Sequence, residues 1–364
     1  MDPLRRNYHR VASVIEKWTV IATQLAGFAY RERQKPTAGI PYTQRLSLIR
    51  NGFHSTRTRD YDLERYDLSA YLPDFSGAVS PGQLAGSDAA IAMNKLTFHQ
   101  ILTDRYEDAI PTVYGVIHNG TVRAETGAVL TDDCVGWLRE QLHRHERLVC
   151  KPVTGVGGAN VYVLERSDDG PVVNGRELSL TTLVDQFGSQ TTYLVNEFVD
   201  QAEYAETIFP DATNTIRVIT LRDVTTQEPF VARAIHRFGV AASAPVDNWD
   251  KGGISAHVDI ETGTMTTAAQ NTASGIRWLE DHPETGAPIT GISIPRWDRL
   301  REEITTIAAH LQQLPLVGWD IVITEDGYAV LEGNIRPTHE MMQIHEPFLT
   351  DTRVREFFDY HGVI

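Results

Sequence analysis

Lysine is scarce in this chain. Among its 364 residues the basic side chains are 28 arginines and only five lysines, and the formal net charge is −15. A protein that binds nucleic acid through the phosphate backbone needs a basic face, so this charge argues against nucleic acid as a partner. A small anionic ligand remains compatible with the sequence if the few cations gather in one cleft.

Cysteines and long hydrophobic runs are lacking as well. The two cysteines, Cys134 and Cys150, cannot build a disulfide framework and do not form a C-x-x-C pair, which favours a reducing, cytoplasmic location. No stretch approaches the roughly 18 uncharged apolar residues of a membrane-spanning helix, so we expect a soluble protein without a membrane span. Near the start, apolar residues from Val11 to Phe28 recur at helical spacing and predict an amphipathic helix rather than a signal peptide.

The order of elements predicts an α+β protein. At 364 residues the chain exceeds the usual size of one domain, so two or three lobes are expected. Residues 1–87 are typical of an N-terminal helical region followed by a turn-rich connector. Beyond them, antiparallel hairpins alternate with helices instead of forming βαβ units. Strands are expected at 112–117, 121–125, 192–199, 213–223, 229–239 and 252–263 and in the pair of segments 316–327 and 328–337, and helices at 88–105, 131–146, 178–188 and 295–314.

The stretch CKPVTGVGGANVYVLE, residues 150–165, places Lys151 before Gly155, Gly157 and Gly158. A dinucleotide-binding loop opens a helix, whereas the alternating segment ANVYVLE predicts a strand. A Walker loop is excluded because the lysine precedes the glycines. Two interpretations remain: a plain hairpin turn beside a solvated lysine, or a hairpin lid whose backbone N–H groups approach phosphate oxygens.

The segment GWDIVITEDGYAVLEGN carries oxygen ligands on two strands. Glu332 and Asn334 are two residues apart in one strand and therefore share a face, and the turn at 325–327 brings Asp320 of the preceding strand alongside them. Such carboxylate and amide oxygens suit a hard cation such as Mg²⁺ that also takes phosphate oxygens. Merely solvated acids are the alternative, but acids within apolar strands need a partner.

These segments together resemble the ATP-grasp superfamily. MNKLTFHQIL, LVCKPVTGVGGANVYVL, YLVNEFV and GWDIVITEDGYAVLEGN stand in the order of its phosphate-binding lysines, glycine-rich lid, adenine hinge and metal signature. TNTIRVITL and DNWDKGGISAHVDIETG more particularly resemble the sugar-transfer-associated branch, over roughly residues 88–345. The resemblance implies two α+β lobes that sandwich ATP, a small lobe at 88–199 with the lid and a large lobe at 200–364 with the metal site.

The resemblance also implies roles for individual residues. Lys95 and Lys151 match the lysines on ATP phosphates, and Gly155, Gly157 and Gly158 form the lid. The hinge corresponds to Glu197, Phe198 and Val199, with Glu203 as the candidate ribose ligand. Arg217 matches an arginine that faces the transferred phosphate, and Arg237, Asn248 and Lys251 match positions near the acceptor. Asp320, Glu332 and Asn334 match the ligands of Mg²⁺, or of Mn²⁺ in its place.

Two parts of the chain depart from the superfamily pattern. Residues 1–87 do not resemble the first domain that usually helps to hold the carboxylate substrate, so that substrate site cannot be transferred. After Asn334 the chain continues IRPTHEMMQIHEP, where Arg336 either contacts substrate or pairs with a neighbouring acid. His236, His257 and His339 lie near these segments without the spacing of zinc ligands, which predicts surface or hydrogen-bonded histidines.

The expected activity is that of an ATP- and Mg²⁺-dependent carboxylate–amine ligase that forms an amide or peptide bond through an acyl-phosphate. The expected partners are small-molecule carboxylate and amine substrates. A kinase that phosphorylates a hydroxyl, with a base near Asp250 or His257, is the first alternative. A regulatory protein that binds ATP without turnover is the second, although Asp320, Glu332 and Asn334 argue against it.

Overall fold

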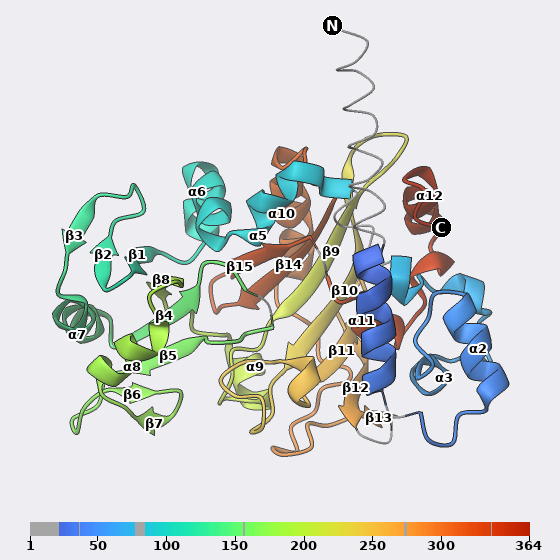
Figure 1. Ribbon diagram of the computed structural model, residues 1–364, viewed down its shortest axis with the longest axis horizontal. Helices are drawn as coiled ribbons and strands as arrows, with labels where there is room; N and C mark the ends of the chain where they lie inside the picture. Colours follow the sequence, from blue (N-terminus) through green and yellow to red (C-terminus); the bar gives the residue numbers. More distant parts are fainter. Residues whose placement is uncertain (1–21, 36, 77–83, 156, 273–274, 336) are drawn as a thin grey trace, which may run out of the picture.

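The structure is a computed structural model and describes residues 22–35, 37–76, 84–155, 157–272, 275–335 and 337–364. Most of the amphipathic pattern predicted near the start, and Arg336, lie outside these residues. Figure 1 shows two sheets side by side, with the N-terminal helices against the edge of the second sheet that is remote from the first. Helices and antiparallel sheets confirm the α+β class. Across the described ranges, no helix has the length and apolar character needed to cross a membrane.

The first sheet has eight strands in the order β3-β2-β1-β8-β4-β5-β6-β7. Its strands are β1 (Val113–His118), β2 (Thr121–Arg123), β3 (Val129–Thr131), β4 (Arg147–Pro152), β5 (Tyr162–Glu165), β6 (Val172–Val173), β7 (Arg176–Glu177) and β8 (Thr192–Glu197). Helices α7 (Cys134–His145) and α8 (Leu180–Phe187) cover one face, where Leu148 and Cys150 of β4 pack against them. The alternate residues Val149 and Lys151 consequently point from the opposite face.

The second sheet has seven strands in the order β13-β12-β11-β10-β9-β14-β15. Its strands are β9 (Ile216–Arg222), β10 (Pro229–Phe238), β11 (Ile254–Val258), β12 (Met265–Thr272), β13 (Gly275–Leu279), β14 (Leu316–Ile323) and β15 (Tyr328–Asn334). Helices α6 (Lys95–Tyr106) and α10 (Trp297–His310) pack on one face, where Ile216 and Val218 join the largest apolar cluster. Arg217 and Ile219 therefore face the other side.

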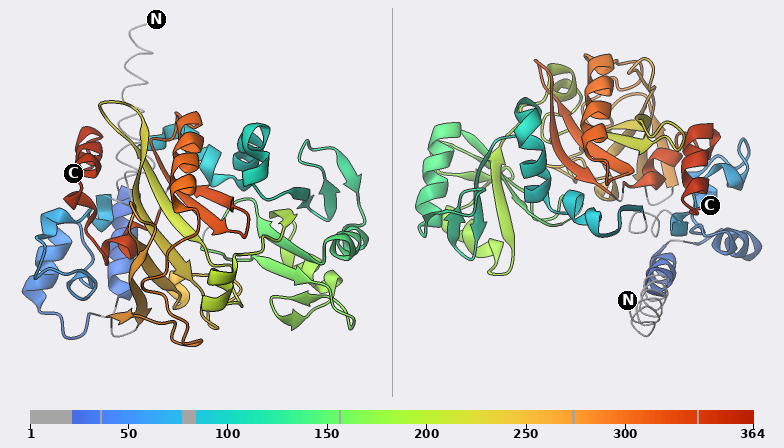
Figure 2. Two further views of the ribbon diagram at one scale, coloured as in Figure 1. Left: turned by 180° about the vertical axis from the view of Figure 1, so that it is seen from behind. Right: turned by 90° about the horizontal axis from the view of Figure 1, so that it is seen from above.

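Smaller elements cover that other side of the second sheet. Helices α11 (His339–Gln343) and α12 (Thr352–Tyr360) supply Met342 and Phe357 to an apolar cluster with Ile219. The described N-terminal residues include a helix at 22–34, α2 (Tyr42–Arg50) and α3 (Arg57–Asp60). Views from behind and above show these helices beside β13 and α12, at the end of the molecule away from the first sheet (Figure 2).

Two helix starts differ from the sequence prediction. The single helix expected from residue 88 is divided into α5 (Ala89–Met93) and α6, because the Asn94 side chain accepts hydrogen bonds from Leu96 and Thr97 N–H and caps α6. Helix α7 begins at Cys134 rather than at the expected residue 131, because the Asp133 side chain caps it by accepting a hydrogen bond from Gly136 N–H. Helix α9 (Glu203–Ile208) connects β8 to β9 and was not predicted.

Candidate functional site

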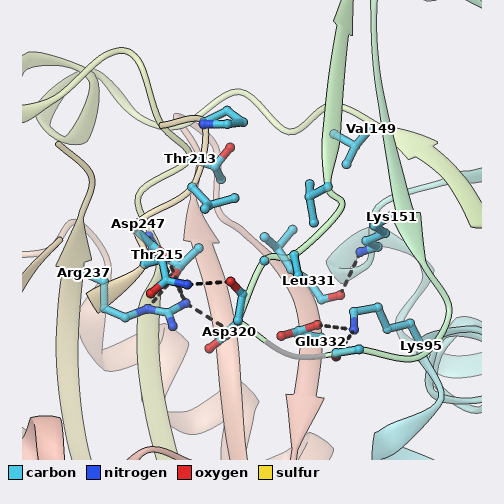
Figure 3. Close-up of a pocket in the computed structure, with 18 of the residues that line it drawn as sticks. Lys95, Val149, Lys151, Thr213, Thr215, Arg237, Asp247, Asp320, Leu331 and Glu332 are labelled. Atoms are coloured by element: carbon cyan, nitrogen blue, oxygen red, sulfur yellow. Dashed lines mark hydrogen bonds and ion pairs between the residues drawn. The ribbon is translucent and has the colours of Figure 1, made fainter. Parts of the chain in front are cut away.

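A cleft with a cavity volume of about 260 Å³, partly open to solvent, lies between the two sheets. Figure 3 shows lysines entering it from the first sheet and from α6, opposite charged residues of the second sheet. Most of the residues predicted from the sequence line this cleft: Lys95, Lys151, Gly155, Gly157, Gly158, Glu197, Phe198, Val199, Arg217, Arg237, Asn248, Asp320, Glu332 and Asn334.

Lys151 reaches the cleft because of the alternation along β4. Its Nζ donates a hydrogen bond to the Leu331 carbonyl oxygen of β15 at 3.3 Å. Burial lowers the pKa of Lys151 to about 8, although Glu332 nearby acts in the opposite direction. The Lys151 amine donates to only one neutral acceptor, so a bound anion would favour its charged form.

Lys95 is positioned by the break that precedes α6. It is the first residue of the helix, directly after the capping Asn94, and its Nζ reaches Glu332 of the edge strand β15. There it lies 3.0 Å from Glu332 Oε2 and donates to the Gly155 carbonyl oxygen at 3.1 Å. Lys95 thus connects the glycine-rich hairpin to the second sheet.

The three predicted oxygen ligands meet as the sequence indicated. Asp320 of β14 is the direct cross-strand partner of Glu332 in β15, and Gly318 is the partner of Asn334. The Asn334 amide donates to Glu332 Oε1 at 3.3 Å. Three side chains that bear oxygen atoms therefore occupy one patch of the sheet.

Two arginines continue this patch across the sheet. Arg217 of β9 is the cross-strand partner of Asp320 and binds it through Nε and through Nη2, the latter at 2.8 Å from Oδ2. Arg237 of β10 places its Nη2 at 3.2 Å from the same oxygen. Burial alone would raise the pKa of Asp320, but the two guanidinium groups outweigh it and hold the pKa well below its usual range. Asp320 is therefore ionised.

Thr215 and Asp247 belong to the site but were not predicted. Asp247 is buried and accepts hydrogen bonds from Thr215 N–H at 2.8 Å and Thr215 Oγ1 at 2.6 Å. Arg237 donates from Nε to Thr215 Oγ1 at 3.0 Å, and its Nη2 lies 3.4 Å from Asp247. Burial raises the pKa of Asp247, with Arg237 opposing this shift. Both residues lie inside the quoted segments TNTIRVITL and DNWDKGGISAHVDIETG, where Thr215 is two residues before Arg217 and Asp247 directly precedes Asn248, but neither was assigned a role.

The glycine-rich stretch is a hairpin, as the alternating residues after it predicted. Cys150 of β4 pairs with Tyr162 of β5, and Gly155, Gly157 and Gly158 of the connecting segment line the cleft. Asn248 donates to the Gly157 carbonyl oxygen at 2.6 Å. Gly158 has a φ of +67° and a Cβ there would lie 3.1 Å from a Val246 methyl carbon, so this close approach requires glycine. We call the described residues 153–155 and 157–161 the lid.

The predicted hinge, residues 197–199, follows the end of β8. Thr112 N–H donates to the Glu197 carboxylate at 3.1 Å, and the Arg147 guanidinium lies 4.1 Å from the centre of the Phe198 ring. Apolar side chains of both sheets, Val149 and Leu331 among them, line the cleft with this segment. A planar nucleobase would fit the end of the cleft at residues 197–199, between its apolar walls and the exposed edge of the backbone.

Two predicted residues are not among those that line the cleft. Glu203 is exposed at the first turn of α9, where its backbone N–H donates to Glu325 Oε1 at 2.6 Å. Lys251 ends the short helix η4 (Trp249–Lys251) and is exposed, whereas Trp249 and Asp250 of the same turn line the cleft. His257 also lies outside it.

The described residues fit a metal-bound polyphosphate. Cations and acids that now pair with each other, such as Lys95 with Glu332 and Arg217 with Asp320, could instead bind phosphate oxygens and Mg²⁺ respectively. Asp320, Glu332 and Asn334 could hold the metal. Because Asp320 is already bound to two arginines, metal binding there would require these contacts to rearrange.

A family model described as sugar-transfer associated ATP-grasp matches residues 84–354. No curated protein matches the chain. Solved structures with similarity include D-alanine–D-alanine ligase from Bacillus anthracis, with a TM-score of 0.39 and 12% identity over 77% of this chain and 69% of that one.

Two further structures are similar at the same level. VanG D-Ala:D-Ser ligase from Enterococcus faecalis has a TM-score of 0.42 and 12% identity over 77% of this chain and 63% of that one. N5-carboxyaminoimidazole ribonucleotide synthetase from Thermotoga maritima has a TM-score of 0.35 and 13% identity over 69% of this chain and 43% of that one. The chain thus spans less than half of the synthetase and under two thirds of the D-Ala:D-Ser ligase.

Proposed function

The chain belongs to the sugar-transfer associated ATP-grasp family, and from this premise we propose that it is an ATP- and Mg²⁺-dependent carboxylate–amine ligase. The observation that carries the proposal is the convergence of Lys95, Lys151, Arg217 and Arg237 with three oxygen ligands in one cleft, in a chain whose net charge is −15. A cluster of cations in an acidic protein favours a small anionic ligand over a polyanion surface.

In this proposal the two lysines bind ATP phosphates and the hinge at 197–199 holds the adenine edge. Asp320, Glu332 and Asn334 hold Mg²⁺, which supplies charge neutralisation at the phosphates. Mn²⁺ suits the same oxygen ligands. Arg217 faces the transferred phosphate and stabilises its charge, and Arg237 lies near the acceptor, since phosphoryl transfer requires positioning and electrostatics rather than a protein nucleophile.

The substrates are a small carboxylate and an amine. The carboxylate accepts the phosphoryl group to give an acyl-phosphate, and the amine then displaces phosphate to form an amide. An acyl-phosphate is already activated, so the second step needs no strong base. The lid excludes water from this intermediate, because Asn248 and Lys95 hold its backbone against the second sheet.

A kinase is the second candidate, and one observation favours it. Asp250 is an exposed carboxylate that lines the cleft, where it could accept a proton from a hydroxyl. The other base considered, His257, does not line the cleft. The ligase is preferred on family membership.

Product stoichiometry tests the proposal. The protein is incubated with ATP, Mg²⁺ and pooled metabolites, and ADP, free phosphate and phosphorylated products are measured. A ligase releases phosphate and ADP in equal amounts, and hydroxylamine traps the acyl-phosphate as a hydroxamate. ADP without free phosphate, with the phosphoryl group on a hydroxyl, would establish the kinase instead. Glu332→Ala serves as the inactive control.

A further inference from the structure

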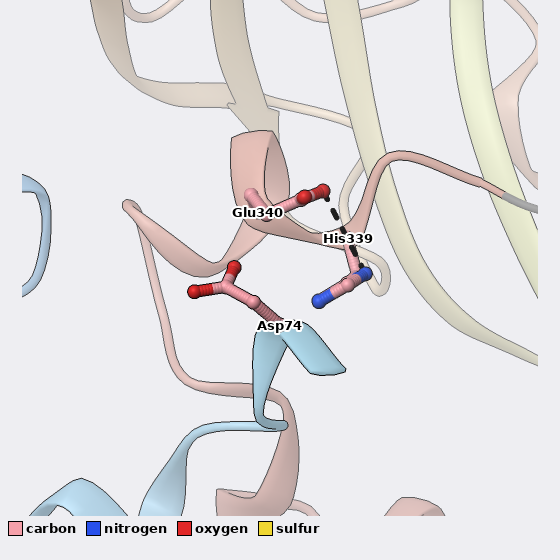
Figure 4. A group of neighbouring side chains, drawn as sticks. All are labelled: Asp74, His339 and Glu340. Atoms are coloured by element: carbon pink, nitrogen blue, oxygen red, sulfur yellow. Dashed lines mark ion pairs between the residues drawn. The ribbon is translucent and has the colours of Figure 1, made fainter. Parts of the chain in front are cut away.

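A second polar cluster lies at the junction between the N-terminal residues and α11. Asp74, His339 and Glu340 each present a ligand atom, and these atoms all lie within 4.8 Å of one another. Figure 4 shows the three side chains meeting between a short N-terminal helical turn and α11. None of the three lines the cleft, although Thr338 and Met341 beside them do.

The cluster carries more negative than positive charge. Arg57 binds Asp74 through Nη2 at 2.7 Å and Asp60 through Nη1 at 2.9 Å, and lies 3.7 Å from Glu340. One guanidinium therefore faces three carboxylates. A divalent cation would balance the two remaining charges.

An unpaired nitrogen points to a ligand independently of these charges. The His339 side chain is 9% exposed, and its Nε2 is buried without a hydrogen-bond partner among the described residues. Its Nδ1 lies 3.7 Å from Glu340 Oε2. Figure 4 shows the other ring nitrogen turned toward Asp74. A buried imidazole nitrogen without a partner is costly unless a donor or metal ion occupies the position.

We propose that Asp74, His339 and Glu340 bind a divalent transition-metal ion of the Zn²⁺ type. One imidazole nitrogen and two carboxylates are a donor set that such ions accept, whereas Mg²⁺ prefers oxygen alone. The ligand atoms have to close from 4.8 Å toward the spacing set by bonds of about 2.0–2.2 Å, which side-chain rotation of the half-buried Glu340 permits.

This ion would link residue 74, which precedes the family match, to residues 339–340 within it. The sequence could not indicate the site, because its ligands are far apart along the chain and have no zinc-type spacing. His339 was predicted as a surface or hydrogen-bonded residue; it is buried in the structure, and the proposal gives it a role as a ligand. The site does not depend on the proposed ligase activity, since its ligands are separate from Asp320, Glu332 and Asn334.

Metal binding by the full chain tests the proposal. Chelator-treated protein is titrated with Zn²⁺ by calorimetry without nucleotide, and with Co²⁺ while visible absorption is recorded. We expect one Zn²⁺ per chain that Glu332→Ala retains, and a Co²⁺ spectrum typical of a nitrogen ligand. His339→Ala and the nearly isosteric Glu340→Gln should each weaken binding by about tenfold or more.

The matched control is His143→Ala, which removes an exposed histidine on α7 and should leave binding unchanged. Circular dichroism shows whether each variant is folded. If His339→Ala is unfolded, Zn²⁺ binding by Glu340→Gln and the Co²⁺ spectrum of the wild type test the proposal instead. Absence of Zn²⁺ binding in the wild type, or equal binding in wild type and both ligand variants, would overturn the proposal. If the wild type binds Zn²⁺ but shows no ATP-dependent ligase turnover, the result would count against the proposed ligase activity and not against the metal site.

Discussion

Lys151 shows how surroundings prepare one residue for a ligand. Its charge is enclosed by protein, its amine donates to the neutral Leu331 carbonyl, and its pKa is lowered to about 8 by burial. A bound phosphate would favour the charged form and raise the pKa again. Below pH 8 the amine is charged in both states, whereas above pH 8 ATP binding has to take up a proton.

ATP affinity should therefore fall as the pH rises above about 8. The decrease is at most about tenfold per pH unit, because one proton is linked to binding. Lys151→Arg should remove this dependence, since arginine keeps its charge above pH 12. Calorimetry with a non-hydrolysable ATP analogue between pH 7 and about 9.5 measures both proteins. Parallel curves for wild type and variant would assign the titration to another group.

Glu332 illustrates a side chain that serves the site more than the core. It lies 3.0 Å from Lys95 and its side chain remains 25% exposed. We expect Glu332→Ala to abolish Mg²⁺-dependent turnover while the unfolding midpoint changes little, since surface ion pairs contribute about 0–1 kcal/mol. ADP formation and thermal unfolding are measured together. Glu228→Ala, in an exposed turn, is the control, and wild-type activity of Glu332→Ala would contradict the metal assignment.

At the scale of elements, local patterns predicted what depends on neighbours in sequence. The hairpin of β14 and β15 placed Asp320 beside Glu332 because one turn fixes the register. The alternation after Gly158 identified β5. The pairing of Arg217 with Asp320 could not be predicted from spacing, since β9 and β14 are about a hundred residues apart and become neighbours only through the sheet order.

Other elements were missed because their signal is tertiary. Helix α11 is short, and its Met342 is buried by contacts with other segments rather than by a periodic pattern. The division of α5 from α6 depends on Asn94, whose side chain competes with the helix backbone for N–H groups. This division matters for the site because it places Lys95 at a helix start.

The contact between α6 and β15 gives a prediction at this scale. Gly333 lies between two candidate metal ligands, and a Cβ there would be 2.5 Å from Phe98 Cε2 of α6. Gly333→Ala should force α6 away, with a loss of about 1–3 kcal/mol in unfolding free energy and weaker ATP binding through the displaced Lys95. Gly327→Ala, where a Cβ meets nothing within 4 Å, is the control in the same hairpin. Unchanged stability of Gly333→Ala would show that Phe98 moves freely.

At the scale of the whole molecule, the N-terminal residues and the second sheet share one packed region. Leu48, Phe53, Tyr61 and Tyr71 form an apolar cluster with Ala269 of β12 and Ile344 after α11. The family model begins only at residue 84, so this packing lies largely outside it. We infer that the N-terminal residues 37–76 fold together with the second sheet.

Gln343 is the polar link in this region and provides the test. It is 1% exposed, accepts a hydrogen bond from Leu72 N–H at 2.7 Å and donates to the Leu72 carbonyl oxygen at 3.0 Å and to Tyr61 Oη at 3.2 Å. Gln343→Leu keeps the volume but leaves the Leu72 backbone groups without partners. Each buried unpaired group costs about 1–3 kcal/mol, so the unfolding free energy should fall by roughly 2–4 kcal/mol.

Urea denaturation followed by circular dichroism measures this loss of unfolding free energy. Proteolysis in low urea shows whether the N-terminal residues alone are destabilised. If the two regions fold together, Gln343→Leu lowers the midpoint of the main transition. If they fold separately, only the N-terminal residues become protease-sensitive and the main transition stays in place. Met342→Leu, a volume-conserving change at the adjacent buried position, should cost less than about 1.5 kcal/mol and separates lost hydrogen bonds from altered packing.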